Sequence, residues 1–204
     1  MLIFPKQHFS WNQLQAWETD KELYRQKYFT KEGVANLTNR GMAKGKEMAE
    51  ALEAKKLSGD PLMDAVMVML PKFEIMDIEF LVDFRIDGDI IPLWIQPDSY
   101  KADLTEYLEY KTSQIPWTKK MADEHRQIDF YDVGIWIRKN GQFIPKHKII
   151  DVRTRKDPRG KIMATGEFFE IETKRSTADI LRMMVRIKKA VKEISEEYNK
   201  FLFS

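Results

Sequence analysis

The stretch Pro97-Asp98, followed after ten residues by Glu109-Tyr110-Lys111, decides the fold and the chemistry that this sequence predicts. Its second half lies in an apolar, β-prone run, Tyr107-Leu-Glu-Tyr-Lys-Thr-Ser113, so we expect a strand over residues 104–111. Side chains alternate between the faces of a strand, so Glu109 and Lys111 point one way and Tyr110 points the other. If the preceding segment lies alongside, two carboxylates and an ammonium group converge on one place.

Such a group suits phosphodiester hydrolysis. The carboxylates of Asp98 and Glu109 can hold Mg²⁺ or Mn²⁺, which are hard ions that prefer oxygen ligands over the ligands typical of zinc. A bound metal polarises the phosphate and lowers the pKa of a coordinated water. Lys111 can orient that water or offset charge that develops in the transition state. The alternative is that Glu109 and Lys111 form a solvated ion-pairing ladder, but their apolar surroundings favour a catalytic role.

Further strands are expected on both sides of this stretch. Residues 73–86 and 90–95 are rich in Ile, Phe and Val, and the turn Asp87-Gly88-Asp89 separates them as a hairpin. Residues 97–103 form a polar connection to the central strand. Two shorter strands are expected over residues 143–153 and 162–173.

Helices are expected before and after these strands. Ser10 and Gln13 have the spacing of a capping box at the start of the first helix. A second helix is expected over residues 40–56, and a third begins at Pro61 behind its cap Asp60. Residues 117–136 have helical character, and Ser176 with Asp179 caps a long last helix. The order of elements predicts a mixed α/β (α+β) fold in which helices flank a central mixed sheet.

Composition places the chain among ordinary globular proteins. It has 204 residues, of which 43% are hydrophobic and 32% charged, so we expect a single domain over residues 1–204. There are no cysteines, which excludes disulfides, thiol catalysis and cysteine-ligated metals. No apolar run is long enough to span a membrane and no secretion signal is apparent, so we expect a cytoplasmic protein without a membrane partner.

Positive charge is concentrated in the C-terminal part of the chain. Residues 138–192 contain sixteen Lys and Arg against six Asp and Glu, a local excess of ten, although the net charge of the whole chain is only +2. Such an excess predicts a surface that binds phosphates, whereas a solvated face or another polyanion is the alternative. The expected phosphate contacts lie in a loop over residues 153–161, at Arg153, Arg155, Lys156, Arg159 and Lys161.

Other functional motifs do not fit. Gly41-Met-Ala-Lys-Gly-Lys46 has one residue too few for a phosphate-binding loop and is followed by Glu47 in place of Ser or Thr. The three histidines, His8, His125 and His147, have no metal-ligand spacing, and no Gly-x-Ser-x-Gly elbow occurs.

Taken in order, the motifs resemble the RecB-type and phage-exonuclease branch of the PD-(D/E)XK nuclease superfamily. The matching segments are the aspartate segment Ile91–Tyr100, then Glu109-Tyr-Lys, then Gln127-Ile-Asp-Phe-Tyr131, which corresponds to the Q-x-x-x-Y helix of that branch. The opening His8-Phe-Ser-Trp-Asn-Gln-Leu14 is similar to the family's N-terminal helix, and Gly45–Leu52 resembles the helix that carries its first acidic motif. The resemblance covers roughly residues 8–136 and implies a restriction-endonuclease-like fold.

The resemblance also implies roles for individual residues. Catalytic roles fall to Asp98, Glu109, Lys111, Gln127 and Tyr131, and the metal ligands to Glu50, Asp98, Glu109 and the carbonyl of Tyr110. The family usually has glycine before its aspartate, whereas this chain has Gln96 and Pro97, so Asp83 or Asp87 is the alternative ligand. Glu47 is the alternative to Glu50.

The function implied is that of a Mg²⁺- or Mn²⁺-dependent deoxyribonuclease, expected to be an exonuclease acting in DNA recombination, repair or phage DNA processing. The alternative is a catalytically silent DNA-binding or interaction protein on the same fold. The expected partner is DNA, in the cytoplasm of a bacterial or phage-infected cell. The sequence has no helicase motif, so any ATP-driven unwinding of DNA would need a partner, such as a recombination or helicase protein.

Overall fold

The structure, a computed structural model, describes residues 2–30 and 58–204. The helix expected over residues 40–56 lies outside these residues, and so do Glu47, Glu50 and the segment Gly41–Lys46.

A five-stranded mixed sheet forms the centre of the described structure. Its strand order is β2 (Ile75–Met76), β5 (Ser99–Tyr100), β6 (Glu106–Ser113), β7 (Lys146–Lys156) and β8 (Ile162–Thr173). Strands β6 and β7 are parallel and the other neighbours are antiparallel. Parallel neighbours need a crossover, which here passes through α5 (Lys119–Asp123) and α6 (Arg126–Arg138). The expected mixed sheet flanked by helices is therefore confirmed.

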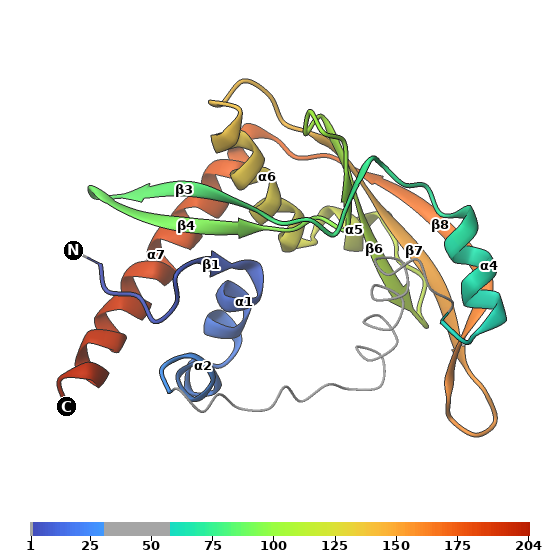
Figure 1. The fold of residues 1–204 in the computed structure, drawn as a ribbon, viewed down its shortest axis with the longest axis horizontal. Helices are drawn as coiled ribbons and strands as arrows, with labels where there is room; N and C mark the ends of the chain where they lie inside the picture. The colour runs from blue at the N-terminus through green and yellow to red at the C-terminus, as the bar shows by residue number, and fades with distance from the viewer. Residues whose placement is uncertain (1, 31–57) are drawn as a thin grey trace.

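A second sheet of three strands projects to one side of the molecule (Figure 1). It consists of the hairpin β3 (Phe80–Ile86) and β4 (Asp89–Ile95), to which the short β1 (Phe9–Ser10) adds in parallel. Asp87 and Gly88 both have positive φ values, 50° and 95°, as the tight turn expected from Asp-Gly requires.

The strand expected over residues 73–86 is not continuous, and this part of the prediction is wrong. Asp77 has a φ of 49°, in the left-handed region, so the chain bends between β2 and β3 and the two strands join different sheets. Similarly, the connection expected over residues 97–103 contains β5, and the central strand runs from Glu106 to Ser113 rather than from residue 104 to residue 111.

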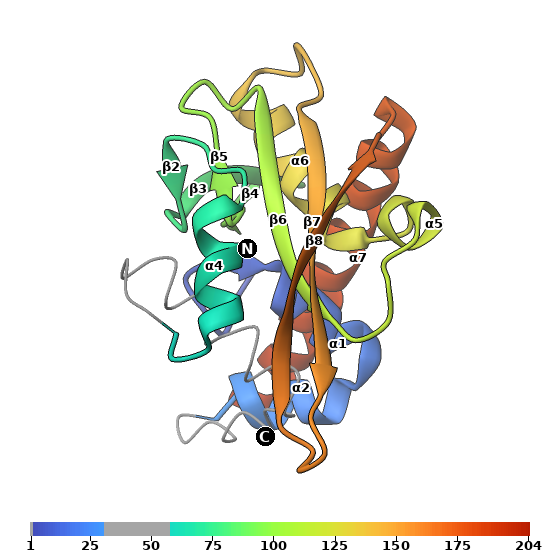
Figure 2. The ribbon, with the colours of Figure 1, turned by 90° about the vertical axis from the view of Figure 1, so that its right-hand side faces the viewer.

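The two faces of the large sheet are covered by different helices (Figure 2). Leu108 and Tyr110 of β6 belong to one buried cluster with side chains of α4 (Pro61–Met69). Tyr107 belongs to the other cluster, which includes Ile128 and Tyr131 of α6. The alternation of β6 therefore turns Glu109 and Lys111, which share the parity of Tyr107, toward α6.

Side-chain caps set where several helices begin. Ser10 accepts a hydrogen bond from the backbone N–H of Gln13 at the start of α1 (Trp11–Thr19), and α2 (Lys21–Tyr28) follows behind Asp20. Asp60 caps α4, and Ser176 and Asp179 form the expected capping box of α7 (Thr177–Leu202). None of the helices in residues 2–30 and 58–204 is both long and apolar enough to cross a membrane.

Helical structure between residues 117 and 136 is interrupted, which the sequence did not indicate. Helix α5 ends at Asp123 and α6 begins at Arg126, after His125 in an extended conformation. Helix α6 then packs closely on β4, because Gly134 has no Cβ to meet the buried side chain of Ile95. This close packing fixes α6 over the face of β6 that carries Glu109 and Lys111.

Candidate active site

Glu109 and Lys111 form a partly buried ion pair on β6. The ammonium Nζ of Lys111 lies 2.6 Å from Oε1 of Glu109, whose side chain is almost fully buried. The same ammonium donates a second hydrogen bond to Oε1 of Gln127, over 2.9 Å. Strand and helix thus hold this lysine from two sides.

Asp98 lies beside this pair. One of its carboxylate oxygens accepts a hydrogen bond of 2.6 Å from the backbone N–H of Tyr110. The pairing of β5 with β6, in which Ser99 lies opposite Leu108, brings the aspartate there. The backbone N–H and C=O of a residue in a strand point to the same side, so the carbonyl of Tyr110 also faces the edge occupied by Asp98.

The two alternative aspartates lie elsewhere. Asp83 is exposed on β3, in the other sheet. Asp87 is in the hairpin turn, where it forms ion pairs with Lys188 and Lys192 of α7. Asp98 is therefore the one of the three candidates that the structure brings to Glu109.

The electrostatics of the site suit a bound cation. Burial, followed by the charge of Glu109, raises the pKa of Asp98 well above its usual value, and burial raises the pKa of Glu109. Oε2 of Glu109 is buried without a hydrogen-bond partner among the residues that the structure describes. A buried carboxylate oxygen without a partner is costly, so a divalent cation would satisfy an oxygen that these residues leave unpaired.

The described residues do not supply a complete set of protein ligands. They contain no group of three or more His, Cys, Asp or Glu side chains placed to hold a metal. Asp98, Glu109 and the Tyr110 carbonyl offer only oxygen ligands, which fits Mg²⁺ or Mn²⁺, ions that often retain several waters. Any contribution of Glu50, or of its alternative Glu47, lies outside the residues that the structure describes.

The pair Gln127 and Tyr131 from α6 completes the surroundings of the lysine. Nε2 of Gln127 donates to the hydroxyl oxygen of Tyr131 over 2.6 Å, so the amide bridges that hydroxyl and Lys111. Burial lowers the pKa of Lys111, but the carboxylates of Glu109 and Asp98 more than offset this, so its pKa is raised and it stays charged. Burial and the charge of Lys111 lower the pKa of the neighbouring His125 to about 4.

Asp77 is a further acid near the site that the sequence reasoning missed. Its N–H donates to the carbonyl of Asp98 over 3.0 Å, and its side chain accepts a hydrogen bond of 2.8 Å from Nε2 of Gln96. Its charge also contributes to the raised pKa of both Asp98 and Glu109. The signal available in the sequence was the pair Asp77 and Glu79, which interrupts an apolar strand pattern.

The five basic residues over 153–161 do not all lie in a loop, and this prediction is wrong for three of them. Arg153, Arg155 and Lys156 belong to β7, which extends as a hairpin with β8. Arg153 is largely buried and pairs with Asp151, which also accepts a hydrogen bond from the N–H of Trp117. The guanidinium of Arg153 thus anchors the segment that leads into α5.

The other four residues form an exposed basic end of this hairpin, defined as Arg155, Lys156, Arg159 and Lys161. None of them has an ion-pair partner within residues 2–30 and 58–204. In contrast, many other cations of the basic half are paired, such as Lys148 with Glu170 and Arg186 with Glu18. The hairpin end is therefore a cluster of four exposed cations that have no ion-pair partner among the described residues.

No family model matches this chain, and no curated protein sequence is significantly similar to it. Solved structures do match. The structure of LHK-Exo in complex with dAMP has a TM-score of 0.53 and 14% identity, with 97% of this chain and 92% of that chain covered. A second structure of this alkaline exonuclease, from Laribacter hongkongensis, has a TM-score of 0.48 and 13% identity, covering 95% and 91% of the two chains.

A phage-related exonuclease from Haemophilus somnus 129PT matches with a TM-score of 0.46 and 14% identity, over 94% of this chain and 80% of that one. At these identities the likeness concerns the fold, and the match to LHK-Exo in complex with dAMP establishes it over nearly the whole length of both chains. The fold that the resemblance implied is thus confirmed: this chain shares the restriction-endonuclease-like fold of LHK-Exo.

Proposed function

We propose that this protein is a Mg²⁺- or Mn²⁺-dependent deoxyribonuclease whose active site is formed by Asp98, Glu109 and Lys111. The observation that carries the proposal is the convergence of these groups, with one oxygen of Glu109 buried and unpaired among the described residues. Asp98, Glu109 and the carbonyl of Tyr110 would hold the metal. When bound, the metal would polarise the scissile phosphate and make a coordinated water more acidic.

The residues around the metal position prepare the site for an anionic substrate. Lys111 presents a charged ammonium group next to both carboxylates, where it can stabilise charge on the phosphate oxygens in the transition state. Gln127 holds this ammonium through its side-chain oxygen and is itself held by Tyr131. We assign Gln127 and Tyr131 as positioning residues, because their contacts act through Lys111.

His125 is unsuited to act as a general base near neutral pH. Its ring contacts the same oxygen of Gln127 that binds Lys111, at 3.2 Å, and its lowered pKa of about 4 keeps it neutral. A general base works best when its pKa lies near the working pH, whereas His125 is too weakly basic for that role. Its contact with Gln127 instead supports the amide.

DNA is the substrate class that we infer, and degradation from an end is the mode. The structural neighbours are described as exonucleases, and one of them was crystallised with dAMP. The exposed basic end of the β7–β8 hairpin supplies cations that suit the phosphates of a nucleic-acid backbone. Roles in recombination, repair or phage DNA processing, and a helicase or recombination partner, remain predictions from the sequence.

The direct test is incubation of purified protein with linear DNA in the presence and absence of Mg²⁺. The matched pair is Glu109→Gln, which removes a metal-binding charge, and Glu106→Gln on the same strand, whose carboxylate pairs with Lys101 instead. We expect Mg²⁺-dependent cleavage by the parent and by Glu106→Gln, and a loss of at least about a hundredfold in Glu109→Gln. Binding of DNA without cleavage in either Mg²⁺ or Mn²⁺ would refute the proposal and favour a catalytically silent DNA-binding protein.

A further inference from the structure

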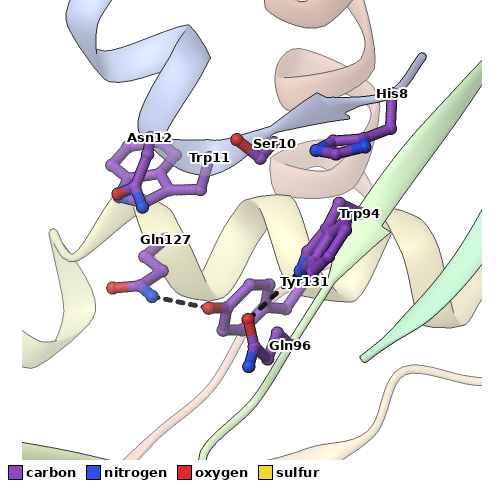
Figure 3. A pocket seen from close by; sticks show the side chains of 8 residues that line it. All are labelled: His8, Ser10, Trp11, Asn12, Trp94, Gln96, Gln127 and Tyr131. Carbon is purple, nitrogen blue, oxygen red and sulfur yellow. Dashed lines mark hydrogen bonds between the residues drawn. The ribbon is translucent and has the colours of Figure 1, made fainter. Parts of the chain in front are cut away.

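A cavity of about 270 Å³ opens beside Gln127 and Tyr131 (Figure 3). The rest of its lining comes from the N-terminal segment and from the C-terminal end of β4: His8, Ser10, Trp11, Asn12, Trp94 and Gln96. The pairing of β1 with β4, in which Ser10 lies opposite Trp94, holds these two segments together. The proposed catalytic groups use none of the residues from His8 to Asn12.

Aromatic rings stand on two sides of this cavity. The ring of His8 lies 4.4 Å from that of Trp94, tilted by 45°, and together they form one wall. Trp11, on the first turn of α1, stands on the other side with Asn12 (Figure 3). The side chains of Trp11 and Trp94 are both partly exposed, so their rings are accessible to a planar ligand.

The lining is polar but carries no formal charge at neutral pH. Its lining residues in the described part of the chain include no Lys, Arg, Asp or Glu, and burial followed by the charge of Lys6 lowers the pKa of His8. The side chains of His8 and Asn12 make no hydrogen bond to any residue that the structure describes, and both residues line the cavity with groups that can form hydrogen bonds. A neutral, planar group with hydrogen-bonding edges fits this lining better than a phosphate does.

The cavity is also connected to the proposed active site. Gln127 lines it and binds Lys111. On the opposite side, Nε1 of Trp94 donates to Gln96 over 3.1 Å, and Gln96 donates to Asp77, the neighbour of Asp98. A group bound between the two tryptophans would therefore lie next to a phosphate held at the acids and the lysine.

We propose that this cavity is a subsite for one unpaired nucleobase of the substrate strand, adjacent to the scissile phosphate. This inference rests on the proposed function and names the part of the substrate that the neighbouring residues take. Drug-sized ligands occupy pockets of about 300–1,000 Å³, so a cavity of 270 Å³ suits a single base and is too small for a base pair. Stacking on aromatic rings tolerates any base, so the subsite should select an unpaired end without reading sequence.

The test measures binding without cleavage, in Ca²⁺ or EDTA, with single-stranded oligonucleotides. In one series every phosphate is kept and one base at a time is replaced by an abasic site. For the parent protein we expect one position near an end at which loss of the base weakens binding by roughly tenfold. In Trp94→Ala the same loss should have little further effect, whereas Trp94→Phe, which keeps a stacking ring, should restore the dependence on the base.

Phe203→Ala is the matched control, because Phe203 is an aromatic residue that is 84% exposed near the C-terminus. It should behave as the parent does. The inference is overturned if no single base matters, if Trp94→Ala keeps the parent's dependence, or if only removal of a terminal phosphate weakens binding. Cleavage in Mg²⁺ is measured separately: cleavage without base dependence refutes the subsite alone, and base dependence without cleavage refutes the nuclease proposal and leaves the subsite.

Discussion

Substitution of Gly134 by alanine tests how closely α6 must approach β4 for the site to form. A Cβ at this position would lie closer than 3.0 Å to both Cγ1 and Cδ1 of Ile95. Ile95 is fully buried on β4, so its side chain has no solvent-filled space into which to rotate. The added methyl group therefore has to push the helix and the strand apart.

Two opposing effects set the size of the change. Alanine is a better helix former than glycine by about 1 kcal/mol, whereas overpacking of a buried site typically costs about 1–3 kcal/mol. Because two carbons of Ile95 are displaced at once, we expect the cost of overpacking to exceed the gain in helix propensity. The free energy of unfolding should then fall by about 1–2 kcal/mol. Activity should fall as well, since α6 carries Gln127 and Tyr131.

A double-mutant cycle with Ile95→Ala isolates this interaction. Ile95→Ala alone should cost about 2–5 kcal/mol because it leaves a cavity. In that background the clash is gone, so Gly134→Ala should stabilise the protein by about 1 kcal/mol through its helix propensity. The assay is urea unfolding followed by circular dichroism. The reasoning is refuted if Gly134→Ala is as stable as the parent, or if it lowers the free energy of unfolding equally in the parent and in Ile95→Ala. Either result would show that close packing against Ile95 does not fix the position of α6.

Three other predictions concern the charged groups. Replacement of Arg155, Lys156, Arg159 and Lys161 by alanine should weaken DNA binding and flatten its salt dependence by about 0.9 log units for each phosphate that is no longer neutralised. The control is alanine at Arg182 and Arg186, which are already paired with Asp179 and Glu18, and an equal change in both variants would place the DNA path elsewhere. Crystals soaked in Mn²⁺ should show an anomalous peak between Asp98, Glu109 and the Tyr110 carbonyl, and a peak beside Asp83 or Asp87 would contradict the assignment of Asp98. Hydrogen bonds from Ser176 lower the pKa of Asp179 to about 2, below its unfolded value of 3.8, so the contribution of Asp179 to stability is present above pH 3.8 and lost as the pH falls toward 2. The difference in free energy of unfolding between the parent and Asp179→Asn should therefore shrink over this range, and a constant difference would contradict the capping role.

Local sequence patterns were sufficient for much of the fold. The alternation around Glu109, the Asp-Gly turn at residues 87–88 and the capping pair Ser176 and Asp179 each depend on neighbours in the chain, and the structure has all three features. The Pro97-Asp98 segment was harder, because it reaches Glu109 only through the pairing of β5 with β6. Choosing Asp98 over Asp83 or Asp87 required the resemblance to a known motif.

Features that depend on distant parts of the chain were not predictable in this way. The bend at Asp77 divides an apolar run between two sheets, and only the tertiary arrangement shows that the acid at the bend touches Asp98. The sequence predicted Arg153 to be an exposed loop residue, yet its guanidinium forms an ion pair with Asp151 on the same strand. The aromatic cavity likewise joins residues 8–12 to residues 94–96 and 127–131, which no local pattern connects.

The most direct test of the proposed active site is the single-turnover rate of Lys111→Ala on linear DNA at saturating Mg²⁺, measured beside its affinity for the same DNA. Lys111 is one positive charge at the centre of the site, and its loss removes stabilisation of the transition state while the basic hairpin end is left intact. We predict a rate lower by about 10²–10³ with DNA affinity nearly unchanged. Cleavage by the folded variant at the rate of the parent would show that the group of Asp98, Glu109 and Lys111 is not the catalytic centre.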